Sequence, residues 1–133
     1  MTQTDGTKRY DLEERTERFA RQVMEFVRSL QPGLVNHEVA RQLVRSAGSV
    51  GANYIEANSS LGKKDFLMRI RICRKEAKES AYWLRLIEAG SAGPAAVRNL
   101  LVQEANELVS IFGAIVTKAE DAATRVSHPS QSP

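Results

Sequence analysis

The stretch KKDFLMRIRICRKEAKESAYWLRL, residues 63–86, shows most clearly how this chain folds. Its apolar and small residues recur at spacings of three and four, which places them on one side of an α-helix. Basic residues occupy the opposite side of that helix. The helix predicted for this stretch, extended to residue 88, has a core-facing seam of six residues: Phe66, Ile70, Cys73, Ala77, Ala81 and Leu84.

Three further helical patterns accompany this one. They predict a first helix over 11–30, a second over 36–59, and a fourth that has Pro94 in its first turn and reaches about residue 123. Four helices with short connections predict an all-α, antiparallel up-down four-helix bundle over 11–124, with flexible ends at 1–10 and 125–133. The predicted seams are Leu12, Phe19, Val23, Phe26 and Leu30; Val39, Leu43, Ala47, Val50, Tyr54 and Ala57; and Val97, Leu101, Leu108, Ile111 and Ile115.

The composition is that of an ordinary single domain. The chain has 133 residues, of which 42% are hydrophobic and 26% charged. The N-terminal stretch is polar, and no apolar run approaches the roughly 20 residues that span a bilayer. A lone cysteine, Cys73, excludes an internal disulfide. We expect a cytoplasmic protein without membrane contact.

Positive charge is concentrated in the middle of the chain. Residues 41–85 hold ten lysines and arginines against four acidic residues, a net charge of +6, whereas the flanks carry −1 and −2. A concentrated field of this kind favours a polyanionic partner. The alternative is an evenly solvated surface.

Five of these cations form one stripe on the helix over 63–88. They follow one another at spacings of 7, 4, 3 and 7, opposite the core seam, with Arg69 and Arg74 beside them. Such a stripe suits a phosphate backbone, although a merely solvated helix face stays open. Tyr82, on the same stripe, could stack on a base or serve packing. The predicted nucleic-acid-binding residues are Lys64, Arg71, Lys75, Lys78 and Arg85.

A second apolar stripe on the same helix predicts an oligomer interface. It lies roughly a right angle or more from the core seam and consists of Met68, Ile72, Trp83 and Leu86. A second apolar run on the fourth helix can be either a wider core face or a further contact. That run is Val102, Ala105, Val109, Phe112 and Val116.

Glycines and polar residues interrupt the second helix. Gly48 and Gly51 share a face with Val44 and Ile55, and small residues there allow a neighbouring helix to approach closely. We interpret a neighbouring group of polar residues as a structural polar cluster that ties helices together rather than a catalytic site. Its members are Ser49, Asn53 and Glu56.

No pattern of an enzyme stands out. His37 and His128 have no histidine or cysteine at ligand spacing, and the Gly48–Gly51 segment lacks the Lys-Ser/Thr of a phosphate-binding loop. Cys73 lies on a core seam, where an inert thiol is expected. We therefore expect no catalytic residues, no metal site and no cofactor.

Residues 45–87 resemble the bacterial four-helix-bundle family typified by the 23S rRNA intervening-sequence protein. The first matching segment pairs Ser49 and Val50 with Asn53 and Glu56. The second is the Lys-Glu-Ala-x-Glu-Ser-x-Tyr-Trp-Leu run over 75–84. Gly51 departs from the proline of many members and indicates a subgroup.

The resemblance carries expectations about assembly and partners. The family is similar to the accessory variability protein of diversity-generating retroelements, a basic pentameric barrel that works with a reverse transcriptase and nucleic acid. The resemblance therefore implies that this chain forms a ring-like homopentamer of four-helix bundles without enzymatic activity. Together with the stripe of cations over residues 64–85, it predicts an RNA-binding accessory protein that acts with a reverse transcriptase or at an rRNA intervening sequence. The alternative is a protein-interaction scaffold that binds no nucleic acid.

Overall fold

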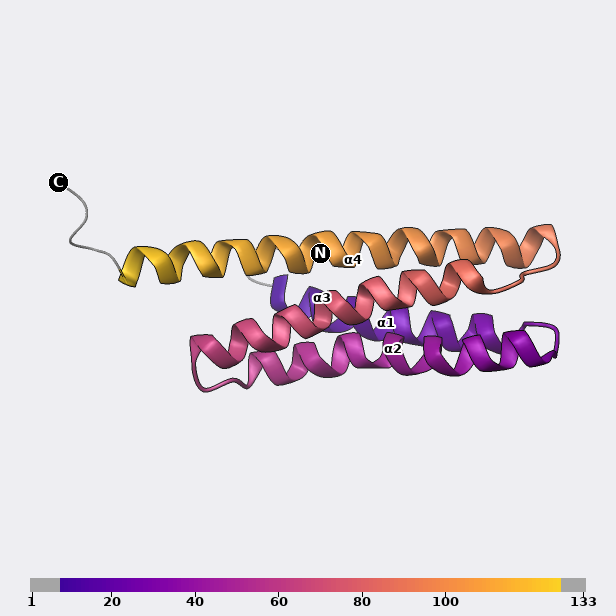
Figure 1. Ribbon diagram of the computed structural model, residues 1–133, viewed down its shortest axis with the longest axis horizontal. Coiled ribbons are helices and arrows are strands. Elements are labelled where there is room, and N and C mark those ends of the chain that lie inside the picture. The colour runs from indigo at the N-terminus through magenta and orange to yellow at the C-terminus, as the bar shows by residue number, and fades with distance from the viewer. Residues whose placement is uncertain (1–7, 128–133) are drawn as a thin grey trace, which may run out of the picture.

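The computed structural model describes residues 8–127, with side chains over 12–122, and this part of the chain forms four α-helices and no strand (Figure 1). Each helix lies beside the next one in the chain, and α4 also contacts α1, so the four helices close into a bundle. The predicted all-α four-helix bundle is confirmed. The helices are α1 (Lys8–Arg28), α2 (Leu34–Asn58), α3 (Lys63–Leu86) and α4 (Ala92–Ser127).

Connections of four or five residues join antiparallel neighbours. The predicted flexible ends lie largely outside the described residues, and the described parts, 8–10 and 125–127, belong to α1 and α4. In the α3–α4 connection Gly90 has φ 84°, a left-handed conformation that favours glycine. Asn36 of α2 holds this connection in place, because its side chain donates to the Glu88 carbonyl and accepts from the Glu88 amide, both at 3.1 Å.

The core follows the predicted seams of the first three helices. Of these seam residues all are buried except Leu30, Val39 and Phe66, which are half-buried against the core. The rings of Tyr54 and Phe112 pack with centroids 5.9 Å apart, which joins α2 to α4. Side chains from all four helices thus meet in one core.

The predicted seam of α4 is partly wrong. Val97 is 43% exposed, and Ile111 and Ile115 are only half-buried. Because α4 packs against α3 on one side and α1 on the other, its buried stripe runs between the two apolar runs and takes members from both. The buried residues of α4 are Leu101, Ala105, Leu108, Phe112 and Val116.

Within the described chain, one segment is long and apolar enough to cross a membrane by length and composition alone. This segment is Ala92–Ala122 in α4. The expectation that the chain has no apolar run long enough to span a bilayer is therefore wrong for α4. Its Leu101, Leu108 and Phe112 belong to the bundle core, and a core helix meets the same two criteria. The length and composition of α4 are therefore weak evidence for membrane insertion.

The two glycines of α2 behave differently. A Cβ atom on Gly51 would lie 3.0 Å from Thr16 Oγ1 and 3.3 Å from Thr16 Cβ, so the backbone of α2 approaches α1 closely at this point. A Cβ atom on Gly48 would meet nothing within 4 Å. The interpretation that glycine permits close packing holds for Gly51; within the described chain no helix approaches Gly48 in the same way.

Polar side chains also join the helices. The hydroxyl groups of Ser46 in α2 and Ser80 in α3 are both buried and lie 2.9 Å apart. Arg15 of α1 binds both Glu104 oxygens, at 2.7 and 2.9 Å, and Glu107 at 2.7 Å. The hydrogen bond to Glu104 raises the pKa of Arg15 above its ordinary value, so Arg15 stays protonated. We name this contact of Arg15 with Glu104 and Glu107 the α1–α4 clamp.

Candidate nucleic-acid interface

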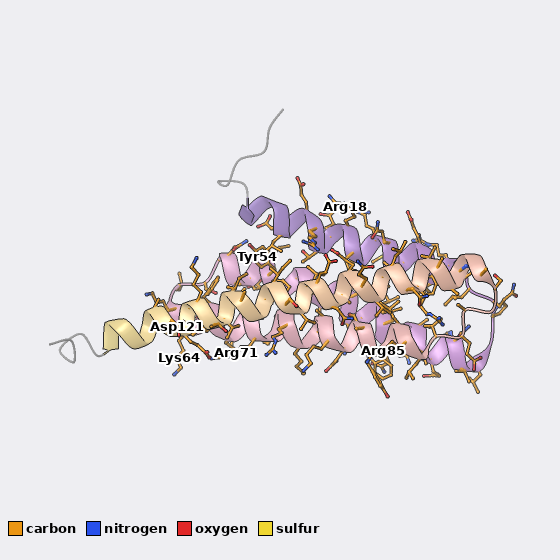
Figure 2. The ribbon with its side chains drawn as sticks, turned by 90° about the horizontal axis from the view of Figure 1, so that it is seen from above. Arg18, Tyr54, Lys64, Arg71, Arg85 and Asp121 are labelled. Atoms are coloured by element: carbon orange, nitrogen blue, oxygen red, sulfur yellow. The ribbon has the colours of Figure 1, made fainter. Side chains whose placement is uncertain are left out.

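The five predicted binding residues all lie on the exposed side of α3. Lys64, Arg71 and Arg85 follow one long edge of the molecule, whereas Arg18 of α1 lies on the opposite edge (Figure 2). The helical spacing places Lys75 and Lys78 on the same side of α3, and both are exposed. The arrangement forms a continuous line of cations, which we name the basic stripe.

Part of the basic stripe borders a groove between α3 and α4. The groove has a volume of about 820 Å³. Its floor and walls combine cations from α3 with small, apolar and acidic residues from α4. The lining residues are Arg71, Arg74, Lys75, Lys78 and Glu79 of α3, and Gly113, Val116, Thr117 and Glu120 of α4.

Arg74 lies against α4 at Gly113. A Cβ atom built on Gly113 would be 3.5 Å from Arg74 Nε and 3.9 Å from Arg74 Cδ, which is ordinary van der Waals contact. Arg74 therefore packs beside the α4 backbone, where alanine would fit but a longer side chain would displace it. Within the described chain Arg74 has no carboxylate partner, so its guanidinium donors remain available to a ligand.

The charge of the groove is only partly balanced. Its four cations face two carboxylates, which leaves a formal charge of +2. Glu120 pairs with Arg71, and Glu79 lies 4.0 Å from Lys75 Nζ. Glu79 is also shared with Arg45 of α2 at 3.5 Å. The groove can thus attract an anion, with Arg74 and Lys78 carrying the uncompensated charge.

The groove contains residues that the sequence pattern did not predict as part of the site. It includes three of the five predicted residues, Arg71, Lys75 and Lys78, whereas Lys64 and Arg85 extend the basic stripe beyond its lining. Thr117 and Glu120 were missed because their helix carries no basic pattern. The one available signal was Gly113, a glycine inside the predicted fourth helix.

Aromatic and apolar side chains adjoin the basic stripe. Tyr82 is 48% exposed and packs edge-on against Trp83, with ring centroids 5.0 Å apart. Trp83 is half-buried, and its indole Nε1 is buried without a hydrogen-bond partner among the described residues. Of the other predicted interface residues, Met68 and Leu86 are exposed and Ile72 is half-buried. This surface of the protomer is available for a contact.

The predicted polar cluster has a different membership. Asn53 of α2 donates to the Ser49 carbonyl at 2.9 Å and accepts from Arg69 of α3 at 3.0 Å. Arg69 therefore ties α3 to α2. Glu56 is exposed, and its side chain makes no hydrogen bond within the described chain; its backbone carbonyl accepts from the Ser59 amide at 3.1 Å and the Ser60 hydroxyl at 3.2 Å. Of the three predicted members, Asn53 alone joins two helices through its side chain, and its partner in α3 is Arg69.

Glu76 is a buried carboxylate that the sequence pattern did not reveal. It is 7% exposed and faces Arg45 of α2, with 3.8 Å between Arg45 Nη2 and Glu76 Oε1. Oε1 is buried and has no hydrogen-bond partner in the described chain. Its position beside the Ser46–Ser80 contact places it in a polar layer between α2 and α3.

The reactive groups of the described chain are few. Cys73 is buried, and the pKa of its thiol rises from 9.0 to about 12, mainly because burial disfavours the thiolate. The Cys73 backbone and Arg69 act in the opposite direction and are outweighed. No group of three or more histidine, cysteine or acidic side chains that could hold a metal ion occurs among the described residues. The chemistry that the groove offers is electrostatic binding.

Comparison with known proteins places the chain in a family. The 23S rRNA-intervening sequence protein family matches residues 8–114. No curated protein matches the chain. Among solved structures, a protein of unknown function from the S23 ribosomal protein family of Bacteroides thetaiotaomicron matches at 25% identity with a TM-score of 0.66. The match covers 78% of this chain and 96% of that one. The chain belongs to the 23S rRNA-intervening sequence protein family.

Proposed function

We propose that this chain is a non-enzymatic accessory protein that binds RNA through the groove between α3 and α4 and the adjoining basic stripe. The observation that carries the proposal is the excess of cations in the groove, four against two carboxylates. The family name, which refers to an intervening sequence of 23S rRNA, supports an RNA-related role.

The lining residues supply the contacts that a phosphate backbone needs. Arg71 and Arg74 present planar guanidinium groups, which bind phosphate oxygens through two parallel hydrogen bonds. Lys75 and Lys78 add point charges, and Thr117 adds a hydroxyl group. Binding would release counterions from the RNA, and this release is the main source of affinity for a surface of this type.

The basic stripe extends the contact beyond the groove. Lys64 and Arg85 lie 21 residues apart on α3, a length of about 32 Å. A strand that follows this line passes several phosphates from one end of α3 to the other. Tyr82, exposed beside the line, offers an aromatic face on which a base can stack without sequence preference.

The proposal includes self-assembly into a ring-like homo-oligomer, with a pentamer as the form that the family resemblance implies. Exposed Met68 and Leu86 and the half-buried Trp83 support a contact with a second copy. Trp83→Glu places a charge in that contact and should reduce the assembly seen by light scattering. A wild-type monomer at micromolar concentration would contradict this part. A reverse transcriptase partner and a cytoplasmic location stay predictions.

Direct binding assays test the RNA proposal. A fluorescently labelled single-stranded RNA is titrated with wild type and with the variant Arg71→Gln/Lys75→Gln/Lys78→Gln, which we name the groove variant. The control variant, Arg18→Gln/Arg21→Gln/Arg28→Gln, removes the same charge from exposed positions of α1. We expect the groove variant to bind at least tenfold more weakly and the control variant to stay close to wild type.

Three outcomes would count against the proposal. Equal losses in both variants would mean that net charge alone decides binding. If wild type binds neither RNA nor DNA, the protein-interaction scaffold becomes the better account. If circular dichroism shows that the groove variant has lost its helices, the basic stripe supports the fold and the assignment of its outward face is wrong.

A further inference from the structure

The Arg71–Glu120 pair lies inside the basic groove. Arg71 comes from α3 and Glu120 from α4, and their side chains are 52% and 49% exposed. Each is therefore open to solvent on one side, and a ligand can reach the guanidinium. An exposed ion pair of this kind is weak, so it can be exchanged for another at little cost.

Glu120 has the chemistry of the ligand that the groove would bind. A carboxylate and a phosphodiester group both present two oxygens to the parallel N–H donors of an arginine. While Glu120 Oε2 holds Nη2 of Arg71, a phosphate cannot use that nitrogen as one of its two donors. The other lining carboxylate, Glu79, is divided between Lys75 and Arg45, and Arg74 and Lys78 have no ion-pair partner within the described chain.

We propose that Glu120 is an internal competitor for the nucleic acid: in the free protein it occupies Arg71, and a backbone phosphate takes its place when RNA binds. The inference rests on the proposed RNA-binding function and adds a residue that sets its affinity. A strand engages Arg74 and Lys78 first, since these are uncompensated, and Arg71 joins only after it exchanges partners. Glu120 thereby weakens the attachment of any strand that uses Arg71 as a contact.

Glu120→Gln tests this exchange, and Asp121→Asn is its matched control. Asp121 is the next residue, is exposed, does not line the groove, and makes no ion pair in the described chain. Both substitutions remove one negative charge from the same turn of α4. We expect Glu120→Gln to tighten binding of a single-stranded RNA about two- to fivefold at low salt, the range that the loss of one exposed ion pair allows. Asp121→Asn should change the dissociation constant by clearly less.

A third comparison isolates the link to Arg71. In an Arg71→Gln background, Glu120→Gln should have no more effect than Asp121→Asn, because the shared partner is gone. Thermal melts of each variant show whether the fold is intact.

The results separate this inference from the proposed function. If wild type lacks salt-dependent RNA binding, the proposed function fails. If wild type binds RNA but Glu120→Gln and Asp121→Asn change affinity equally, the function stands and the competitor is refuted. Weaker binding by Glu120→Gln would also overturn the competitor, since it would mean that Glu120 positions Arg71 for the ligand.

Discussion

Alanine substitutions at Gly48 and Gly51 should change stability in opposite directions. Both glycines lie inside α2, where alanine is favoured over glycine by about 1 kcal/mol. At Gly48 the new methyl group meets nothing within 4 Å, so Gly48→Ala should gain most of that amount. For a domain of this size the gain corresponds to a rise in Tm of about 3–5 °C.

At Gly51 the same methyl group meets Thr16. Its distance of 3.0 Å from Thr16 Oγ1 requires α1 or Thr16 to move. Thr16 is buried, and its hydroxyl donates to the carbonyls of Leu12 and Glu13 at 2.8 and 3.1 Å, so rotation of the side chain breaks these bonds. Overpacking of this kind costs about 1–3 kcal/mol, which offsets the helix gain and leaves Gly51→Ala up to about 2 kcal/mol less stable than wild type.

Thermal or urea unfolding at one fixed protein concentration measures both effects. Thr16→Ala removes the nearest contact, so the double variant Thr16→Ala/Gly51→Ala should be more stable than the sum of the two single changes by at least about 0.5 kcal/mol. Equal increases in Tm for both glycine variants would refute the close approach of α1 and α2. A decrease for Gly48→Ala would refute the open surface at Gly48 and indicate that another chain covers it.

Three further predictions concern the core, the groove and the α1–α4 clamp. Burial raises the pKa of Cys73 in the folded state above that in the unfolded chain, so the unfolded state loses its thiol proton first. The free energy of unfolding should therefore fall as the pH rises above about 9, by roughly 1 kcal/mol at pH 10 relative to the variant Cys73→Ala. Gly113→Ala should raise Tm without weakening RNA binding, whereas Gly113→Leu should displace Arg74 and weaken RNA binding several-fold. Unchanged RNA binding by Gly113→Leu would exclude the groove as the binding site. Arg15→Gln should lower the free energy of unfolding by about 1–2 kcal/mol in urea titrations, because it leaves the partly buried Glu104 without its partner; an unchanged value would mean that the clamp contributes nothing.

Helical periodicity predicted the parts of the fold that depend on one helix at a time. The seam of α3 could be predicted, although this helix has a second apolar stripe, because the seam lies opposite the basic stripe. In α4, apolar residues occupy two stripes, and periodicity alone could not show that Phe112 is buried while Ile111 is only half-buried. The orientation of α4 depends on its contacts with α1 and α3, which the residue pattern of α4 alone does not contain.

The groove illustrates the same limit for the candidate site. The basic stripe follows from spacing on one helix and is visible in the sequence. Arg71 and Glu120 are 49 residues apart, and their pairing depends on the register between α3 and α4. The close approach at Gly51 and the open surface at Gly48 differ for the same reason, because a glycine pattern does not identify the neighbour that faces each position.

The salt dependence of RNA binding tests the central claim most directly. For single-stranded RNA, each phosphate contact adds about 0.7 to the slope of the logarithm of affinity against the logarithm of salt concentration. The groove variant lacks three contacts per protomer, so its slope should be shallower than that of wild type by about 2 for each protomer engaged. The control variant should keep the wild-type slope. If the groove variant keeps the slope of wild type, Arg71, Lys75 and Lys78 do not contact phosphates and the groove between α3 and α4 is not the RNA-binding surface.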